Sequence, residues 1–112
     1  MPPESPLAPA TFYVLFALVN GEKHGYAILK EARELSDDRF QIGPATLYTT
    51  IQRLVNNGWI TPVTNIQSDD PRRRYYRLTP SGRKAVQNEV ARMEALVRKS
   101  KSMRLRPAES SS

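Results

Sequence analysis

The sequence predicts a mainly helical protein with one small β-hairpin, and three observations support this. Four segments have helical signals and glycine or proline residues near their ends: one is a dense apolar run, and in the other three apolar residues recur at helical spacing. Two β-rich segments, 59–66 and 72–78, flank a turn at 68–71. The chain has 112 residues and no cysteine, which indicates one domain with a modest core and no disulfide scaffold.

The first two helices are predicted from different patterns. Residues 8–19 are too apolar for a surface helix, so this segment should be buried on most sides before it stops at Asn20-Gly21. Residues 25–35 alternate apolar and charged positions as an amphipathic helix does. His24 precedes this helix in an expected loop, 21–25. We expect His24 to hydrogen-bond the free backbone N–H groups at the start of this helix; metal binding or proton transfer is the less favoured alternative.

A third helix should begin at Gly43-Pro44 and end at Asn57-Gly58, a stop of the left-handed type. Tyr48 lies at the border of its buried face, with its ring expected in the core. At about 100° per residue, four apolar residues share that face: Leu47, Ile51, Leu54 and Val55. The opposite face is then centred on polar residues and flanked by Ala45 and Gln52. The central residues are Thr46, Thr49, Arg53 and Asn56.

The predicted hairpin has an arginine-rich return strand, which starts Arg72-Arg73-Arg74. Pro62 indicates that the outgoing strand lies at a sheet edge or begins late, because proline cannot donate a ladder hydrogen bond. Tyr75 and Tyr76 should point to opposite faces, so that one of them packs on the core. Trp59, just after the third helix, is expected to anchor the core or an interface.

A last helix is predicted over 80–99, with Thr79 as N-cap and Pro80 in its first turn. Its apolar residues follow spacings of four, three and four, with Leu96 alongside. This is typical of a helix-pairing seam, formed by Val86, Val90, Met93 and Val97. The seam packs either within one subunit or between two. A long projecting helix has little of its own subunit to cover it, which favours a homodimer.

Basic residues concentrate towards the C-terminus. Residues 1–71 contain 5 basic and 8 acidic side chains, whereas residues 72–112 contain 12 basic and 3 acidic ones. This asymmetry indicates a part that contacts nucleic acid or an anionic membrane, or simply a basic solvated surface. The longest apolar run, 12–19, is too short to span a membrane, and the N-terminus does not resemble a secretory signal. We therefore expect a cytoplasmic protein with no membrane partner.

The order of elements, three helices, a hairpin and a further helix, is typical of a winged helix-turn-helix. The predicted organisation is a flexible arm (1–7), a winged helix-turn-helix DNA-binding domain (8–79), a C-terminal dimerisation helix (80–99) and a basic, Ser-rich flexible tail (100–112). Short hydrogen-bonding groups without carboxylates suit base edges, and arginines at a wing tip suit phosphates or a minor groove. The predicted DNA-contacting residues are Thr46, Tyr48, Thr49, Gln52, Arg53, Arg72, Arg73 and Arg74.

Other functions are less well supported by the residues. An enzyme needs an acid, base or nucleophile constellation, and none can be assembled; a cofactor and a metal are not expected. The alternative is a winged-helix module that holds a protein partner without sequence-specific DNA binding. An apolar patch on the third helix would favour it, and the sequence shows none. The arginines of the hairpin also have a purely structural interpretation, in which they form ion pairs with Asp69-Asp70 in the turn.

Four motifs in this order resemble the PadR family of bacterial transcription regulators, over about residues 10–98. They are His24-Gly25-Tyr26, Ala45-Thr46-Leu47-Tyr48, Arg53-Leu54 with Asn57-Gly58, and the run from Arg73 through Leu78-Thr79-Pro80 to Gly82. The resemblance is to the smaller subfamily with a single C-terminal helix. It implies a homodimer, usually a repressor, that binds a palindromic operator through the third helix and the wing. It also implies dimerisation through the C-terminal helix, often with the first helix.

Two positions depart from the family pattern. Ala45 stands where glycine is common, and Val55 stands where a glutamate is frequent. Both changes are expected to alter operator preference without harm to the fold. Some members of the subfamily bind flat aromatic compounds at the dimer interface, sometimes between tryptophans. No tryptophan follows Trp59, so the sequence leaves a small aromatic effector open.

Overall fold

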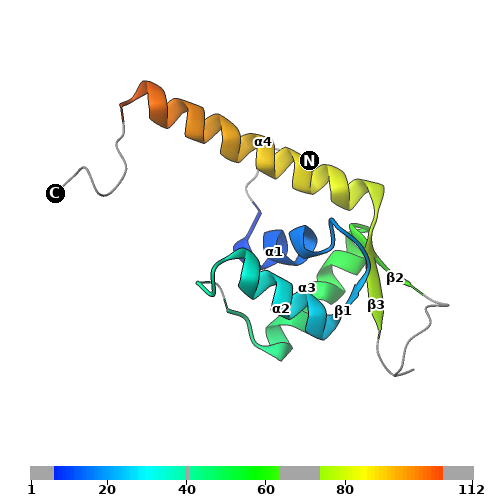
Figure 1. Cartoon of the computed structure of the whole chain (residues 1–112). Coiled ribbons are helices and arrows are strands. Elements are labelled where there is room, and N and C mark those ends of the chain that lie inside the picture. The colour runs from blue at the N-terminus through cyan, green and yellow to red at the C-terminus, as the bar shows by residue number, and fades with distance from the viewer. Residues whose placement is uncertain (1–6, 40, 64–73, 105–112) are drawn as a thin grey trace.

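The computed structural model describes residues 7–39, 41–63 and 74–104. Three short helices pack together beside a small sheet, and the longest helix passes along one side of them (Figure 1). In chain order the elements are α1 (Pro9–Ala17), β1 (Lys23–His24), α2 (Gly25–Leu35), α3 (Pro44–Asn56), β2 (Ile60–Val63), β3 (Tyr75–Leu78) and α4 (Pro80–Ser102). The mainly helical fold with a small sheet is the one that the sequence predicts.

The sheet is antiparallel, with β3 in the centre and β1 and β2 at its sides. Ile60 lies opposite Leu78, and Lys23 lies opposite Tyr76. The expected loop at 21–25 is therefore wrong, because Lys23 and His24 pair with the edge of β3 that the hairpin leaves open. Pro62 lies on an edge strand, as predicted. The turn at 68–71 and the strand positions of Arg72 and Arg73 lie outside the described residues.

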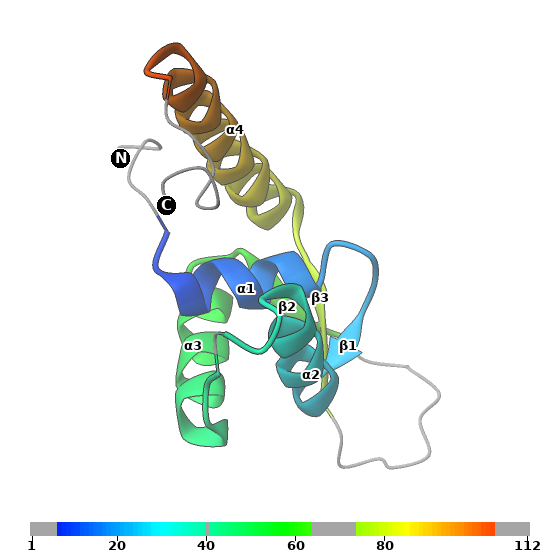
Figure 2. The ribbon, with the colours of Figure 1, turned by 60° about the vertical axis from the view of Figure 1, so that its left-hand side comes forward.

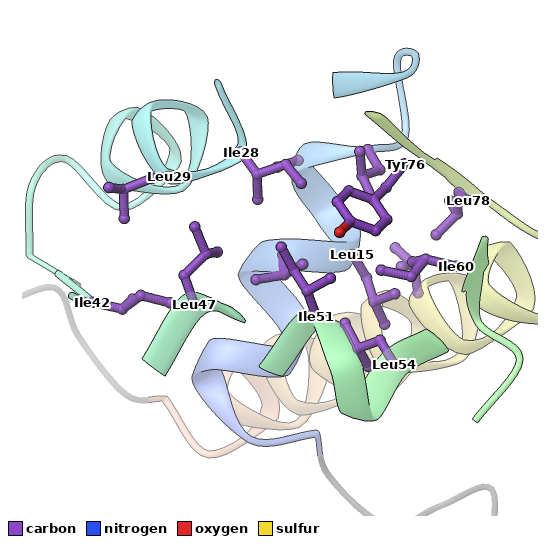
Figure 3. Close-up of a cluster of buried hydrophobic side chains, with 14 residues drawn as sticks. Leu15, Ile28, Leu29, Ile42, Leu47, Ile51, Leu54, Ile60, Tyr76 and Leu78 are labelled. Atoms are coloured by element: carbon purple, nitrogen blue, oxygen red, sulfur yellow. The ribbon is translucent and has the colours of Figure 1, made fainter. Parts of the chain in front are cut away.

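The core forms where α1, α2, α3 and the sheet meet (Figure 3). Leu15 of α1, Ile28 of α2 and Leu54 of α3 are fully buried. Tyr76 of β3 adds its ring to the same cluster (Figure 3). α1 is buried on most sides, as its composition predicts, because α2, α3 and α4 all pack on it. Burial of this apolar surface is the main favourable term that holds the three helices in place.

Helix ends differ from the predicted bounds in two places. α1 ends at Ala17 rather than at 19, since the chain turns before Gly21, whose φ of +148° favours glycine. α4 continues to Ser102, three residues past the predicted end. Lys99 and Lys101 lie in its last turn, where cations interact favourably with the helix dipole.

Glu89 of α4 ties α4 to the segment that leads into α1. Its side chain is only 7% exposed and pairs twice with Arg92, Oε2 to Nη2 at 2.6 Å and Oε1 to Nε at 3.0 Å. The backbone of Leu7 also hydrogen-bonds this carboxylate. The Arg92 hydrogen bonds hold the pKa of Glu89 below its ordinary value, against the opposing effect of burial.

Glu89→Gln is expected to lower the free energy of unfolding at pH 7 by about 1–2 kcal/mol, because charge-assisted hydrogen bonds are lost. The pKa is lower in the folded than in the unfolded state. The contribution is therefore complete above the unfolded value near 4.5 and is lost as the pH falls through the folded value. Urea unfolding of both proteins between pH 3 and 8 measures this difference.

Glu34→Gln, a change at an exposed glutamate of α2, is the control and should have little effect at any pH. A Glu89→Gln deficit that stays constant down to pH 3 would contradict the ion-pair explanation.

Candidate nucleic-acid interface

α2 and α3 form the two helices of the helix-turn-helix, and a short connection joins them. Ser36 caps the end of α2 by donating its hydroxyl to the carbonyl of Arg33 at 3.1 Å. The same carbonyl accepts the backbone N–H of Asp38 at 2.7 Å. Asp37 and Asp38 then take left-handed φ values of 55° and 62°, which turn the chain towards α3. This connection sets the direction in which α3 leaves the core.

α3 presents one continuous exposed face, and its centre differs from the predicted one. Thr50 is 3% exposed and belongs to the buried face, whereas Val55 is only half-buried. At about 100° per residue this turns the exposed face by roughly 30° from the predicted orientation. Gln52 and Ala45 therefore move from the flank to the centre, and Arg53 and Thr46 move towards one edge. We define the central stripe as Ala45, Thr49, Gln52 and Asn56, all exposed.

The exposed face of α3 carries no negative charge. α3 contains no Asp or Glu, and Arg53 is its one basic residue. Its N-cap is Gly43, which has no side chain to cap the first turn, and Pro44 follows. The backbone N–H groups of the first turn give this end a partial positive charge. Both features suit an anionic partner.

Tyr48 occupies a different position from the one predicted. Its side chain is 56% exposed, so the expectation of a core ring is wrong. The ring lies instead across the start of α2, where a Cβ on Gly25 would come within 2.9 Å of the Tyr48 hydroxyl oxygen. The absence of a side chain at Gly25 thus lets Tyr48 pack over this helix end.

An open depression on α3 brings together five side chains: Tyr48, Thr49, Gln52, Arg53 and Asn56. Four of these were predicted as DNA-contacting residues, and Asn56 was seen only as part of the polar face. Within the depression the Gln52 Nε2 donates to the Asn56 Oδ1 at 3.3 Å. The four-residue spacing of these two amides on a helix is the sequence signal that predicts such a bond. Tyr26, at the start of α2, is 68% exposed and is not among the predicted DNA-contacting residues.

The described part of the wing carries one of the three predicted arginines. Arg74 is exposed at the entry to β3, whereas Arg72 and Arg73 lie outside the described residues. Tyr76 is buried and Tyr75 is half-buried, which confirms that they point to opposite faces. Burial raises the pKa of the Tyr76 hydroxyl, and the positive charge of nearby Arg74 partly offsets this.

His24 has the structural role that the sequence predicts. Its Nδ1 accepts the backbone N–H of Ala27 at 3.3 Å and so caps α2. Its ring also meets Tyr75 edge-on, with centroids 5.3 Å apart. Within the described ranges, no group of three His, Cys, Asp or Glu side chains is placed to hold a metal ion.

The predicted pairing seam of α4 divides into two parts. Val86 is 4% exposed and lies in the core of its own chain, so only a small part of its side chain is left to line a surface groove. Val90 packs on the same core, and Met93 is half-buried. Val97 and Leu96 are 54% and 52% exposed and belong to the C-terminal half of α4. This half of the helix extends beyond α1 (Figure 2).

The order of elements and the exposed face of α3 define a winged helix-turn-helix. The model of the transcriptional regulator PadR-like family matches residues 14–88, and the chain belongs to this family. Transcriptional regulator Rv3488 of Mycobacterium tuberculosis is 32% identical over 91 residues, which cover 81% of each chain.

Two solved structures extend the comparison. A transcriptional regulator from Clostridium thermocellum is 31% identical, with a TM-score of 0.68 over 87% of this chain and 90% of its own. Bacillus subtilis PadR, solved in complex with operator DNA, is 26% identical, with a TM-score of 0.62. That match covers 71% of this chain and 45% of the Bacillus protein. Separately, the described helices include none with the length and apolar character that crossing a membrane requires.

Gly25→Ala and Tyr48→Ala are expected to be energetically coupled, because an added methyl group meets the Tyr48 ring. In a double-mutant cycle, Gly25→Ala should destabilise the wild type by at least about 0.5 kcal/mol more than it destabilises the Tyr48→Ala variant. Urea unfolding of the four proteins gives the coupling energy. Thr49→Ala, which removes a neighbouring exposed side chain, should be additive with Gly25→Ala. Additivity in both cycles would argue against the packing of Tyr48 on Gly25.

Proposed function

We propose that this chain is a sequence-specific DNA-binding regulator that acts as a homodimeric repressor on a palindromic operator. The observation that carries the proposal is the exposed, carboxylate-free face of α3, together with the exposed Arg74 at the entry to β3. An α-helix fits the major groove, and carboxylates on its outer face would be repelled by phosphates. The operator complex of Bacillus subtilis PadR, a relative with the same fold, supports this assignment.

The position of each residue on α3 indicates its role in the proposed complex. Thr49 and Gln52 lie on the central stripe and face base edges, which are read by hydrogen bonds and methyl contacts. Thr46, Tyr48 and Arg53 lie towards its edges and contact phosphates with their hydroxyl and guanidinium groups. On the wing, Arg72, Arg73 and Arg74 contact the flanking DNA.

Fluorescence anisotropy on duplexes taken from upstream of the protein's own gene tests this function. Binding to a specific site should be at least about 1,000-fold tighter than binding to a random duplex of equal length, and should persist at physiological salt. Arg53→Ala should weaken binding to both duplexes by a similar factor and reduce the salt slope by about one, as expected for a phosphate contact.

Arg98→Ala, on the part of α4 that lies away from α3, is the control and should leave specific binding unchanged. Equal, salt-labile binding of the wild type to every duplex would leave only a basic surface and reject the regulator function.

The dimer part of the proposal is supported by an apolar groove between α1 and α4. The groove is lined mainly by Phe16, Val19, Val86 and Val90, with the polar residues Arg83, Gln87 and Glu94 and the small Ala91 around them. The exposed pair of Leu96 and Val97 on the same helix is apolar as well. A two-fold axis across α4 would place this pair of one protomer against the groove of its partner, because a two-fold interface uses the same surface twice.

Val97→Asp is expected to convert the dimer to a monomer, because it buries an unpaired charge in the interface. Light scattering coupled to size exclusion measures the mass. The affinity for the operator should fall when the dimer is lost, since one protomer contacts only one half-site. Asn88→Asp adds the same charge on the opposite side of α4 and should remain dimeric. A dimeric Val97→Asp protein with unchanged operator affinity would place the interface elsewhere.

We also propose that a small aromatic effector releases the operator. We place it in the groove between α1 and α4, where it would compete with the partner's Leu96 and Val97 and so alter the arrangement of the two protomers. Phe16 contributes a ring there and is itself stacked on Phe12, with centroids 5.1 Å apart. Release of labelled operator on addition of small aromatic acids, in the same anisotropy assay, tests this part separately.

A further inference from the structure

The amide pair Gln52 and Asn56 lies at the centre of the exposed face of α3. Both side chains are exposed, and the Nε2 of Gln52 donates to the Oδ1 of Asn56 at 3.3 Å. Side chains four residues apart lie above one another on a helix, so this bond forms without distortion of α3. An exposed glutamine otherwise samples many rotamers, and ordering its side chain on binding costs free energy. Asn56 reduces that cost by holding the amide before DNA arrives.

The bond to Asn56 also determines what Gln52 has left to offer. Among the described residues, the Gln52 side chain makes no other hydrogen bond. One N–H of the amide is therefore used, while the carbonyl oxygen and the second N–H remain available. A carbonyl acceptor next to an N–H donor is complementary to adenine in the major groove, where the 6-amino group donates and N7 accepts. Guanine presents two acceptors at this edge and does not match.

The rest of the central stripe is compatible with the same type of base pair. Ala45 and Thr49 are exposed and carry methyl groups, which suit contact with the 5-methyl group of thymine. Arg53, the residue of α3 that would pair best with guanine, lies towards one edge of the face. The centre of the face thus combines two methyl groups with one oriented amide and carries no charge.

We propose that Asn56 is a positioning residue that holds the Gln52 amide in the orientation that reads adenine. Each half-site of the operator then carries an A·T pair opposite Gln52. This inference rests on the proposed DNA-binding function and adds to it a specificity-determining pair of residues.

The test begins with selection of duplexes from a random library by the wild-type full chain, followed by affinity measurements with each base pair substituted in turn. The wild type should select A·T at one position of each half-site and bind about tenfold more weakly when G·C replaces it. Asn56→Ala and Gln52→Ala should both reduce this preference to about twofold. Preferences at other positions and affinity for random DNA should stay unchanged.

A change of one atom in the DNA distinguishes the loss of adenine recognition from a general weakening of DNA binding. Replacement of the adenine with 7-deazaadenine removes the N7 acceptor, so it should weaken binding of the wild type but not of Gln52→Ala. Asn88→Ala, at an exposed asparagine of α4, is the matched control and should behave as the wild type. Thermal unfolding followed by circular dichroism confirms that each variant is folded.

Several outcomes would overturn the inference. Asn56→Ala with an unchanged A·T preference would show that Gln52 needs no positioning. A preference for guanine that disappears in Gln52→Ala would show that the amide is held in the opposite orientation. Uniform weakening on all duplexes would make Asn56 a general contact. Failure of the wild type to select any sequence would reject the regulator function itself, and the inference with it. The wild type alone shows this outcome, whereas a failure of the inference alone appears only in the variants.

Discussion

A single hydrogen-bonded joint at Thr79 connects the two parts of the proposed DNA-binding surface to α4. The Thr79 hydroxyl lies 2.7 Å from the carbonyl oxygen of Gly58 and accepts the N–H of Gly82 at 3.0 Å. The Thr79 N–H donates to the carbonyl of Trp59, also at 3.0 Å. Gly82 completes the joint, because a Cβ there would collide with the Trp59 carbonyl. The end of α3, the base of the wing and the start of α4 are thus fixed to one another.

This joint explains how the proposed dimer interface on α4 would set the positions of the two α3 helices. The free half of α4 extends beyond α1, far from the joint (Figure 2). In the proposed dimer, any change in the angle between the two α4 helices moves both α3 helices, since the joint at Thr79 fixes the start of α4 to the end of α3. An effector in the groove between α1 and α4 would act through this angle, because half-site spacing is a strict geometric requirement.

The sequence predicts most of the fold, because its strongest local signals agree with the tertiary structure. Thr79 caps α4, His24 caps α2, and Gly58 ends α3 with a φ of +78°, all as predicted. The errors arise where tertiary contacts decide. Thr50 is buried although it is polar, so Ala45 and Gln52 join the centre of the exposed face in place of the predicted Thr46 and Arg53. Tyr48 stays outside the core because α2 offers Gly25 as its packing site, which a helical wheel of α3 does not contain.

In the proposed function, general affinity for DNA follows from the sequence alone, whereas specificity depends on tertiary contacts. The net charge of +6 and the arginines of the wing follow from a count of residues, and they support attraction to any DNA. Specificity depends on a neutral stripe whose position is set by burial of Thr50 and whose amide is held by a neighbour one turn away. Neither feature changes the charge of α3. Two relatives with equal charge and equal general affinity for DNA can therefore recognise different operators, if the residues at positions 52 and 56 differ.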